Sequence, residues 1–322
     1  MEIMLAYILD LFFGDPRWLP HPVRGIGWMI NKLEPPLRKC CRGHLSVPYS
    51  LERAPEKIER IAGILLVILV VGVSWYLGFI TIKLAYSMNR YLGSIISILI
   101  IYTLLAVKDL DVESTRVYHS LEQKDIISAR KKLSLIVGRD TDNLEDKEIV
   151  RATVETVAEN IVDGVISPLF YAFIGGAPLA LAYKAVSTLD SMVGYKNEKY
   201  KDFGWASAKL DTLANFIPAR LCIIFLPLAG LLAGKDGLSS WRITRRDGGK
   251  NPSLNSGIAE AAIAGALGVQ LGGLNFYNSV SVLKPLIGDN LKALEPRHIR
   301  ESIRISYICS ALFLISGVFL IA

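Results

Sequence analysis

The sequence predicts an all-α, polytopic integral membrane helical bundle, with helical cytoplasmic loops and broken or re-entrant apolar segments. Three observations carry this prediction. Hydrophobic residues make up 52% of the chain and charged residues only 20%, whereas soluble domains carry about 25% charged residues. The mean hydropathy is +0.38. The apolar residues also gather into long uncharged runs, so we expect a single membrane domain over residues 1–322 instead of two soluble domains.

Three segments are clear candidate spans: 61–82, 91–107 and 305–322. The first holds no charge and is bounded by Arg60 and Lys83. At about 1.5 Å rise per residue, it is long enough to cross about 30 Å of hydrocarbon. A short loop separates it from the second span, which predicts a helical hairpin.

Four further segments are apolar but short or interrupted. Segment 1–13 lacks the basic start of a secretory signal, so it is expected either to cross the membrane or to lie on its surface. Segment 164–183 contains two prolines and the pair Gly175–Gly176, and broken segments of this kind line cavities or re-enter. Segment 212–234 spans only if Arg220 snorkels or is paired. Segment 257–283 is rich in Gly and Ala, which favours close helix packing.

The charge of the chain is basic, at +6, and the cytoplasmic loops of membrane proteins are rich in Lys and Arg. The long loops 14–60 and 108–163 hold nine Lys and Arg each, whereas 83–90 holds two, so both long loops are placed inside. Strict alternation would put two of the later basic loops outside, which suggests that a broken segment does not cross. No stretch interleaves basic and aromatic residues as a single-strand binder would, so nucleic acid is not expected as a partner.

Two clusters of polar residues stand out in the first half of the chain. The stretch GDPRWLPHP at 14–22 is stiffened by three prolines and presents Asp15 and His21, with Arg24 following. In 138–163, Asp140 and Asp142 offer closely spaced oxygen ligands of the kind that Mg²⁺ prefers. The next charged residues follow at four-residue spacing and form one stripe on a helix: Arg151, Glu155, Glu159 and Asp163. A membrane-interface turn and a solvated helix face are the alternatives.

Two more clusters follow in the second half. Segment 184–220 brings Lys184, Asp190 and Lys196 next to an apolar helix, where charges mark either function or a paired structural site. The stretch RRDGGKNPSLNSG at 245–257 suits phosphate, since arginine forks and loop amides bind oxyanions. Its candidate binding residues are Arg245, Arg246, Asp247, Asn251, Ser253 and Asn255. The alternative is that these are the basic residues that commonly flank a membrane span. That interpretation explains the arginines equally well, but it does not explain the small polar residues of NPSLNSG.

These four clusters, in this order, resemble the CobD/CbiB family of cobalamin biosynthesis, the adenosylcobinamide-phosphate synthases. The matching stretches include DLFFGDPRWLPHPVRGIG, GRDTDNL, RATVETVAENIVDG and RRDGGKNPSLNSG, and the resemblance reaches to about Gly273. It implies an ATP-dependent amide ligase in the cytoplasmic membrane, with its catalytic loops facing the cytoplasm. Its substrates would be adenosylcobyric acid and aminopropanol phosphate, or aminopropanol, and its product adenosylcobinamide phosphate. Other late corrinoid-assembly membrane enzymes are candidate partners beside the lipid bilayer.

The chemistry of such a ligase assigns hypothetical roles to the polar residues. A carboxylate must be activated before an amine attacks it, and ATP with Mg²⁺ can do this through an acyl phosphate. We expect Asp140 and Asp142, with Glu155 and Glu159, to hold Mg²⁺-ATP. The candidate phosphate clamps are Lys184, Lys196, Arg245 and Arg246. Asp15, His21 and Asp190 are candidates for orienting or deprotonating the amine.

The sequence contains no GxxxxGK[ST] motif, so an ordinary P-loop is absent. This leaves one alternative open, a membrane transporter or sensor for a corrinoid or another anion that does not consume ATP. A transporter is expected to place its key charges in mid-span. Most of the charges here lie in loops or at segment ends, which favours an enzyme.

Overall fold

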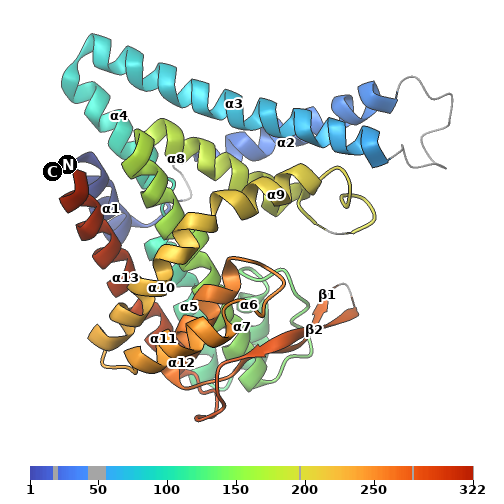
Figure 1. Cartoon of the computed structure of the whole chain (residues 1–322), viewed down its shortest axis with the longest axis vertical. Helices are drawn as coiled ribbons and strands as arrows, with labels where there is room; N and C mark the ends of the chain where they lie inside the picture. Colours follow the sequence, from blue (N-terminus) through green and yellow to red (C-terminus); the bar gives the residue numbers. More distant parts are fainter. Residues whose placement is uncertain (17–20, 43–55, 196, 278, 322) are drawn as a thin grey trace. The chain divides into compact units, whose positions relative to one another are not determined.

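The computed structural model describes residues 1–16, 21–42, 56–195, 197–277 and 279–321. It confirms the predicted fold class, because nearly all of its regular structure is helical (Figure 1). The helices of the first half are α1 (Glu2–Phe13), α2 (Pro22–Arg42), α3 (Glu56–Met88), α4 (Arg90–Tyr102), α5 (Val107–Glu122), α6 (Ile126–Leu133) and α7 (Asp146–Ile161). The π-helical turn η1 (Val162–Ile166) follows, and then α8 (Ser167–Val193), α9 (Trp205–Ala214), α10 (Phe216–Leu232), α11 (Gly237–Asp247), α12 (Ser256–Leu267) and α13 (Arg297–Ile321).

Within the described residues, five helical stretches are long and apolar enough to cross a membrane. They are Glu56–Met88, Arg90–Glu122, Asp146–Val193, Trp205–Leu232 and Arg297–Leu320. The predicted spans 61–82 and 91–107 lie in the first two, and the described part of 305–322 lies in the last. The chain is therefore a multi-pass helical membrane protein.

Two compact units make up the chain, and each is assembled from segments far apart in the sequence. The first unit contains residues 1–9, 16–105 and 168–214, and the second contains 10–15, 106–167 and 215–322. The expectation of one membrane domain stays a prediction.

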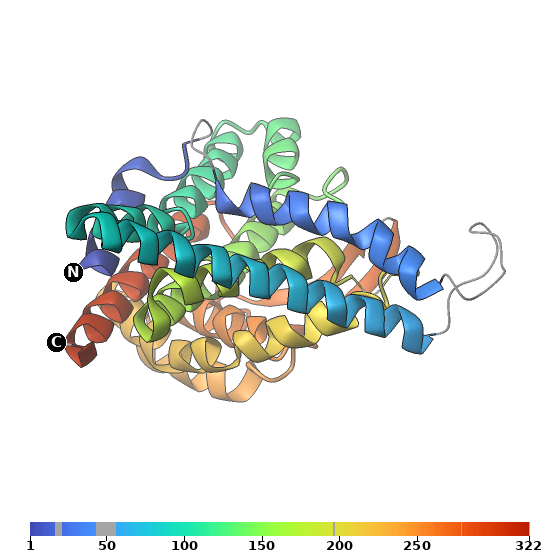
Figure 2. The same ribbon diagram turned by 90° about the horizontal axis from the view of Figure 1, so that it is seen from above.

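In the first unit, α2 lies alongside the N-terminal part of α3, and α3 and α4 form the predicted hairpin (Figures 1 and 2). Asn89 caps α4, because its side chain accepts the backbone N–H of Tyr91 at 2.7 Å. A buried arginine, Arg38, joins these helices to the loop before α9: it pairs with Glu59 at 2.6 Å and donates to the Lys199 carbonyl at 3.0 Å. A charge inside the unit is thus both paired and hydrogen-bonded.

Helix α8 is broken as the sequence predicts, and the break falls at its glycine pair. Gly175 has φ −141° and Gly176 has φ +65°, so neither continues the helix. Gly176 adopts a left-handed backbone that other residues resist, and Pro178 supplies no N–H to the next turn. Pro168 causes no break, since it occupies the first turn of α8.

In the second unit, α7 packs against α12 and α13, and α10 and α11 pack against α12. Helix α7 is buried on every residue from Ile149 to Ala158, including Arg151 and Glu155. Helices α11 and α12 approach closely because a Cβ on Gly265 would lie 2.7 Å from the Ser239 carbonyl oxygen. Arg151 and Glu155 are therefore two of the charged side chains that this unit buries, together with Arg139, Asp247 and Glu260.

Segment 257–283 differs from the expectation of a continuous small-residue segment. Only its first part is helical, as α12, and the rest belongs to an antiparallel hairpin of β1 (Leu271–Tyr277) and β2 (Val280–Ile287). Gly268 ends α12 in the left-handed conformation, with φ +71°. Gly272 and Gly273 have φ of +86° and +91°, which excludes a right-handed helix. The hairpin lies against α7 and α12 (Figure 1).

Candidate functional site

The polar residues of the second unit meet where the loop before α7, helix α7 itself and strand β1 converge. Arg139 and Glu155 form a buried ion pair, with Nη2 and Oε2 2.5 Å apart. The second oxygen of Glu155 accepts the backbone N–H of Gly272 at 2.8 Å. Both carboxylate oxygens are therefore engaged by protein groups. Glu155 holds β1 against α7 in this structure, and its expected contact with Mg²⁺-ATP stays a prediction.

A second arginine extends this network along β1. Arg151 donates to the Leu274 carbonyl at 2.9 Å and to Oδ1 of Asn275 at 3.4 Å. The same oxygen accepts from Arg139 at 2.5 Å, so one buried amide serves two guanidinium groups. Gly273 makes room for this, since a Cβ there would lie 3.1 Å from Arg151. Arg151 is thus bound to the hairpin, and the sequence-based expectation of a substrate contact remains a prediction.

The expected acidic stripe on α7 is divided by burial. Glu155 is 2% exposed, whereas Glu159, one turn later, is exposed. Asp163 lies in the π-helical turn, which changes the angular step of the helix after Ile161. The stripe therefore offers one exposed carboxylate, Glu159, rather than a continuous row.

Asp140 and Asp142 lie in the loop before α7, and Asp140 contacts the hairpin where β1 ends and β2 begins. Asp140 is joined to the hairpin twice: its N–H donates to the Phe276 carbonyl at 2.8 Å, and its Oδ2 accepts from Ser279 N at 2.7 Å. Asp142 is exposed. In the described residues, no group of three or more His, Cys, Asp or Glu side chains could hold a metal ion by itself. Mg²⁺ commonly takes only one or two carboxylates and completes its shell with phosphate and water, so these two residues fit that ion.

The predicted arginine pair divides into one engaged and one available side chain. Arg246 donates to both oxygens of the buried Asp247, at 2.8 and 2.7 Å, and also pairs with Asp289 at 2.8 Å. Arg245 is exposed and stacks over Trp241 at 5.5 Å. Among the described residues, Arg245 has no carboxylate partner. Arg245 can therefore take a phosphate, whereas Arg246 would first have to exchange its partners.

Asp247, the last residue of α11, binds several groups around the end of this helix. Its carboxylate also binds Lys250 at 2.6 Å and the N–H of Gly288 at 2.9 Å. The Arg246 guanidinium, followed by Lys250 and the Gly288 amide, holds the pKa of Asp247 well below its ordinary value against the opposing effect of burial. Asp247 is thus a permanently ionised structural anchor in this structure.

The stretch NPSLNSG forms the entry to α12. Asn251 accepts the N–H of Ser253 at 3.0 Å, and Ser253 accepts the N–H of Ser256 at 3.3 Å. The side chain of Asn251 also donates to Glu260 at 2.9 Å. Asn255 accepts from Arg220 at 3.0 Å, which gives this arginine the partner that its segment requires. The polar residues of the motif therefore shape a loop that links α10 to α12.

Sequence reasoning did not select Arg139, Asn275 or Glu260 as site residues. Glu260 is 2% exposed, and burial, with the charge of Glu155 next, raises its pKa to about 7. A carboxyl group that titrates near neutral pH is a candidate for proton transfer. The sequence feature that could have identified Glu260 is its position as a single glutamate within a run of alanines. Asn275 can be identified as a site residue only from the fold.

The remaining candidates among the described residues lie near the N-terminus and on α8. The N–H of Asp15, which belongs to the second unit, donates to Asp109 at 3.1 Å. His21 starts α2, where Nδ1 accepts the N–H of Val23 at 3.2 Å. Nδ1 is engaged as an acceptor in this bond, and the expected role of His21 in orienting or deprotonating the amine stays a prediction. Arg24 is exposed on the first turn of α2.

Lys184 and Asp190 are half-buried on the C-terminal part of α8, in the first unit. Their expected roles as phosphate clamp and as amine-orienting or amine-deprotonating group stay predictions. Lys196 lies outside the described residues.

Comparison with known proteins identifies the family. A family model described as CobD/Cbib protein matches residues 3–306. The chain is 50% identical over 305 residues to the cobalamin biosynthesis protein CobD of Geobacter metallireducens, covering 95% of this chain and 91% of that protein. It is 43% identical over 310 residues to CobD of Leptospira interrogans, covering 96% and 94%. It is 44% identical over 313 residues to the cobalamin biosynthesis protein CbiB of Salmonella typhi, covering 96% and 93%.

No solved structure matches the chain. The family model and the relatives each cover more than nine-tenths of its length, including all four polar clusters. The chain therefore belongs to the CobD/CbiB protein family.

Proposed function

We propose that this protein is an enzyme of cobalamin biosynthesis that joins a corrinoid carboxylate to an amine at the expense of ATP. The observation that carries the proposal is the match, over almost the full chain, to relatives named cobalamin biosynthesis proteins. The finer reaction follows from the family resemblance of the four polar clusters. It is the ligation of aminopropanol phosphate, or aminopropanol, to adenosylcobyric acid, giving adenosylcobinamide phosphate.

The reaction balances in two steps. A carboxylate oxygen of the corrinoid attacks the γ-phosphorus of ATP, forming an acyl phosphate and releasing ADP. The nitrogen of the amine then attacks the acyl carbon, loses a proton to a base, and expels inorganic phosphate as the amide forms. Each step moves negative charge onto phosphate oxygens, so the site needs cations for the phosphates and an acceptor for one proton.

The second unit supplies groups of both kinds. Mg²⁺ would neutralise the nucleotide phosphates, and Asp140 and Asp142 are our candidates to hold it, with the exposed Glu159 nearby in sequence. Arg245 is the candidate clamp that has no carboxylate partner among the described residues. Glu260 joins Asp15 as a candidate proton acceptor in this unit, because burial raises its pKa to about 7.

ATP is a cytosolic compound, so the proposal requires the catalytic loops to face the cytoplasm. The basic loops 14–60 and 108–163 support this orientation of a protein in the cytoplasmic membrane. A cysteine placed at the exposed Lys199 should be labelled by a membrane-impermeant maleimide in inverted vesicles and not in intact cells. Labelling from outside alone would contradict this arrangement.

The decisive assay uses detergent-solubilised full-length protein with adenosylcobyric acid, aminopropanol phosphate, Mg²⁺ and ATP. We expect a product heavier by one aminopropanol phosphate less one water, with one phosphate released for each amide formed. Parallel reactions with aminopropanol and with ethanolamine phosphate identify the amine donor.

Two controls separate the proposal from its rival. Omitting ATP should abolish product, and a corrinoid without a free carboxylate should release no phosphate above background. Saturable corrinoid binding without product or ATP turnover would instead support a transporter or sensor for a corrinoid or another anion.

A further inference from the structure

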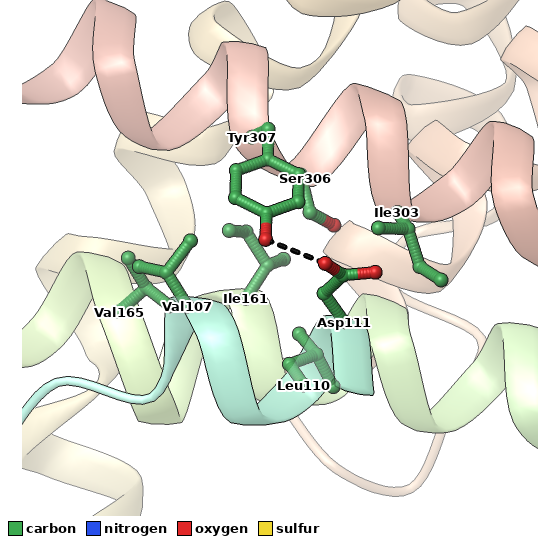
Figure 3. Close-up of a pocket in the computed structure, with 8 residues that line it drawn as sticks. All are labelled: Val107, Leu110, Asp111, Ile161, Val165, Ile303, Ser306 and Tyr307. Carbon is green, nitrogen blue, oxygen red and sulfur yellow. Dashed lines mark hydrogen bonds between the residues drawn. The ribbon is translucent and has the colours of Figure 1, made fainter. Parts of the chain in front are cut away.

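A pocket lies between α5 and α13 in the second unit, away from the residues discussed above. Figure 3 shows its inner end, where Tyr307 of α13 donates a hydrogen bond to Asp111 of α5, at 2.8 Å. The other lining residues of this end are mainly apolar: Val107, Leu110, Ile161, Val165, Ile303 and Ser306. Its free volume is only about 10 Å³, which is room for about one water molecule.

A larger pocket of about 270 Å³ adjoins this space and forms the outer end of the site. The outer end keeps Asp111, Ile303 and Tyr307 and adds four residues: Thr115, Arg300, Arg304 and Ile308. A space of this size holds a phosphate group together with a small substituent. The narrow inner end keeps any charged group in the outer part.

The single carboxylate of the pocket is already neutralised by its neighbours. Asp111 binds Lys108 at 3.1 Å and accepts from Thr115 at 3.0 Å, in addition to Tyr307. One positive and one negative charge therefore cancel on α5. The net charge of the pocket therefore depends on the side chains that α13 contributes.

The two arginines of α13 that line the pocket, Arg300 and Arg304, have no such compensation. They are four residues apart and so lie on the same face of the helix. Arg300 stacks on the ring of Tyr118 at 5.2 Å, and both side chains are exposed. In the part of the chain that the structure describes, neither arginine forms an ion pair with a carboxylate. By contrast, Arg297 on the same helix pairs with Glu295 at 3.0 Å.

The position of this charge along α13 points to the membrane surface. Arg304 is the last charged residue of the chain, and the rest of α13 is apolar. Since the candidate span Arg297–Leu320 contains both parts, the pocket lies at the polar end of a membrane-crossing helix. Phosphate is the commonest anion there, either on lipid headgroups or on water-soluble compounds.

We propose that the α5–α13 pocket is a phosphate-binding site in which Arg300 and Arg304 hold the phosphate oxygens. Arginine forks suit this anion because they donate parallel hydrogen bonds to two of its oxygens. The phosphate belongs either to an anionic phospholipid or to a soluble phosphate compound. The proposal is independent of the ligase reaction, since it uses none of the residues assigned to that site.

The test measures binding, not catalysis, on the full-length protein. Equilibrium dialysis in detergent follows radiolabelled inorganic phosphate. Native mass spectrometry counts phosphatidylglycerol retained by protein from nanodiscs of phosphatidylcholine with phosphatidylglycerol, against nanodiscs of phosphatidylcholine alone. The variant is Arg300→Gln with Arg304→Gln. The matched control removes two charges outside the pocket, Arg297→Gln with Lys131→Gln.

We expect the control to bind like the wild type and the pocket variant to lose about tenfold affinity or more, since it loses the charged hydrogen-bond donors that hold the phosphate oxygens. Arg300→Lys with Arg304→Lys should retain part of the binding, which shows that the pocket still folds. A loss confined to inorganic phosphate identifies a soluble ligand, and a loss of retained phosphatidylglycerol identifies a lipid. Equal binding of both probes by the pocket variant and the control would overturn the proposal.

Discussion

Arg139 and Glu155 form a buried ion pair at 2.5 Å although sixteen positions separate them in the chain. The pair joins the GRDTDNL loop to α7, and Glu155 extends the link to β1 through the Gly272 amide. The pair thus joins the two ends of one sequence cluster, 138–163, and Glu155 connects it with the hairpin that the sequence did not predict. A positioning role for Glu155 follows from these contacts, and it can be separated experimentally from a direct role in binding.

Replacing Glu155 by Gln should destabilise the protein strongly. The change keeps an acceptor for Gly272 but leaves the charge of Arg139 buried without its partner, which costs about 3–5 kcal/mol. We expect a clear fall in the thermal unfolding midpoint in detergent. Glu159→Gln, exposed one turn later, should change the free energy of unfolding by no more than about 0.5 kcal/mol. An inactive Glu155→Gln protein of normal stability would instead favour a direct contact with substrate or Mg²⁺.

Asp140→Asn and Asp142→Asn should each raise the Mg²⁺ concentration needed for half-maximal ligase activity. The expected increase is about tenfold, because a neutral amide oxygen binds the ion more weakly than a carboxylate. The measurement is product formation over a Mg²⁺ titration at saturating ATP. Asp146→Asn, an exposed acid in the first turn of α7, serves as the control for charge. Normal activity of both variants at limiting Mg²⁺ would rule out these residues as its ligands.

The stability of the protein should depend on pH through Glu260. Because burial raises its pKa from the ordinary 4.5 to about 7, the folded protein keeps Glu260 protonated between these values while the unfolded chain ionises it. The contribution of protonated Glu260 to the free energy of unfolding is therefore complete below pH 4.5. It is lost as the pH rises to about 7. Glu260→Gln imitates the protonated form and lacks this dependence.

Unfolding of wild type and Glu260→Gln should therefore be compared from pH 5 upward. We expect the variant to become more stable than the wild type as pH rises, by up to about 3 kcal/mol above pH 7. A constant difference across this range would show that Glu260 keeps one charge state in the folded protein.

Gly63→Ala should destabilise the first unit. A Cβ on Gly63 would lie 1.9 Å from the carbonyl oxygen of Phe203, so α3 and the loop before α9 would have to separate. Overpacking of this kind costs about 1–3 kcal/mol or more. Gly72→Ala on the same helix is the matched control, since a Cβ there meets nothing within 4 Å. Thermal unfolding that shows equal effects for the two variants would contradict this close contact.

Much of the fold could be predicted because long apolar runs have few solutions in a bilayer. A run such as 61–82 must satisfy its own backbone hydrogen bonds, and a helix does this within one segment. The break in α8 could also be predicted from the sequence, because glycine and proline act on the backbone locally. The β-hairpin after Gly268 could not be predicted from the sequence, since glycines next to apolar residues fit both a tightly packed helix and a strand.

The candidate site shows the same division. Residue types and spacing marked Asp140, Arg245 and Asp247 as chemically capable. They did not reveal that Asp247 engages Arg246 at 2.8 and 2.7 Å, or that Asn275 binds two arginines. Such pairings depend on which segments meet in space, and a single sequence carries no information on that.

The sequence by itself determined that the chain is a helical membrane protein and which segments carry chemistry, because hydropathy, backbone stiffness and charge are properties of the residues alone. Only the tertiary structure decided which charges are engaged and which are available. Glu155 and Arg246 find partners across the fold, whereas Arg300 and Arg304 line a pocket without a carboxylate partner among the described residues. The physical reason is that the availability of a charge depends on burial and on neighbours, and both arise only when distant segments pack together.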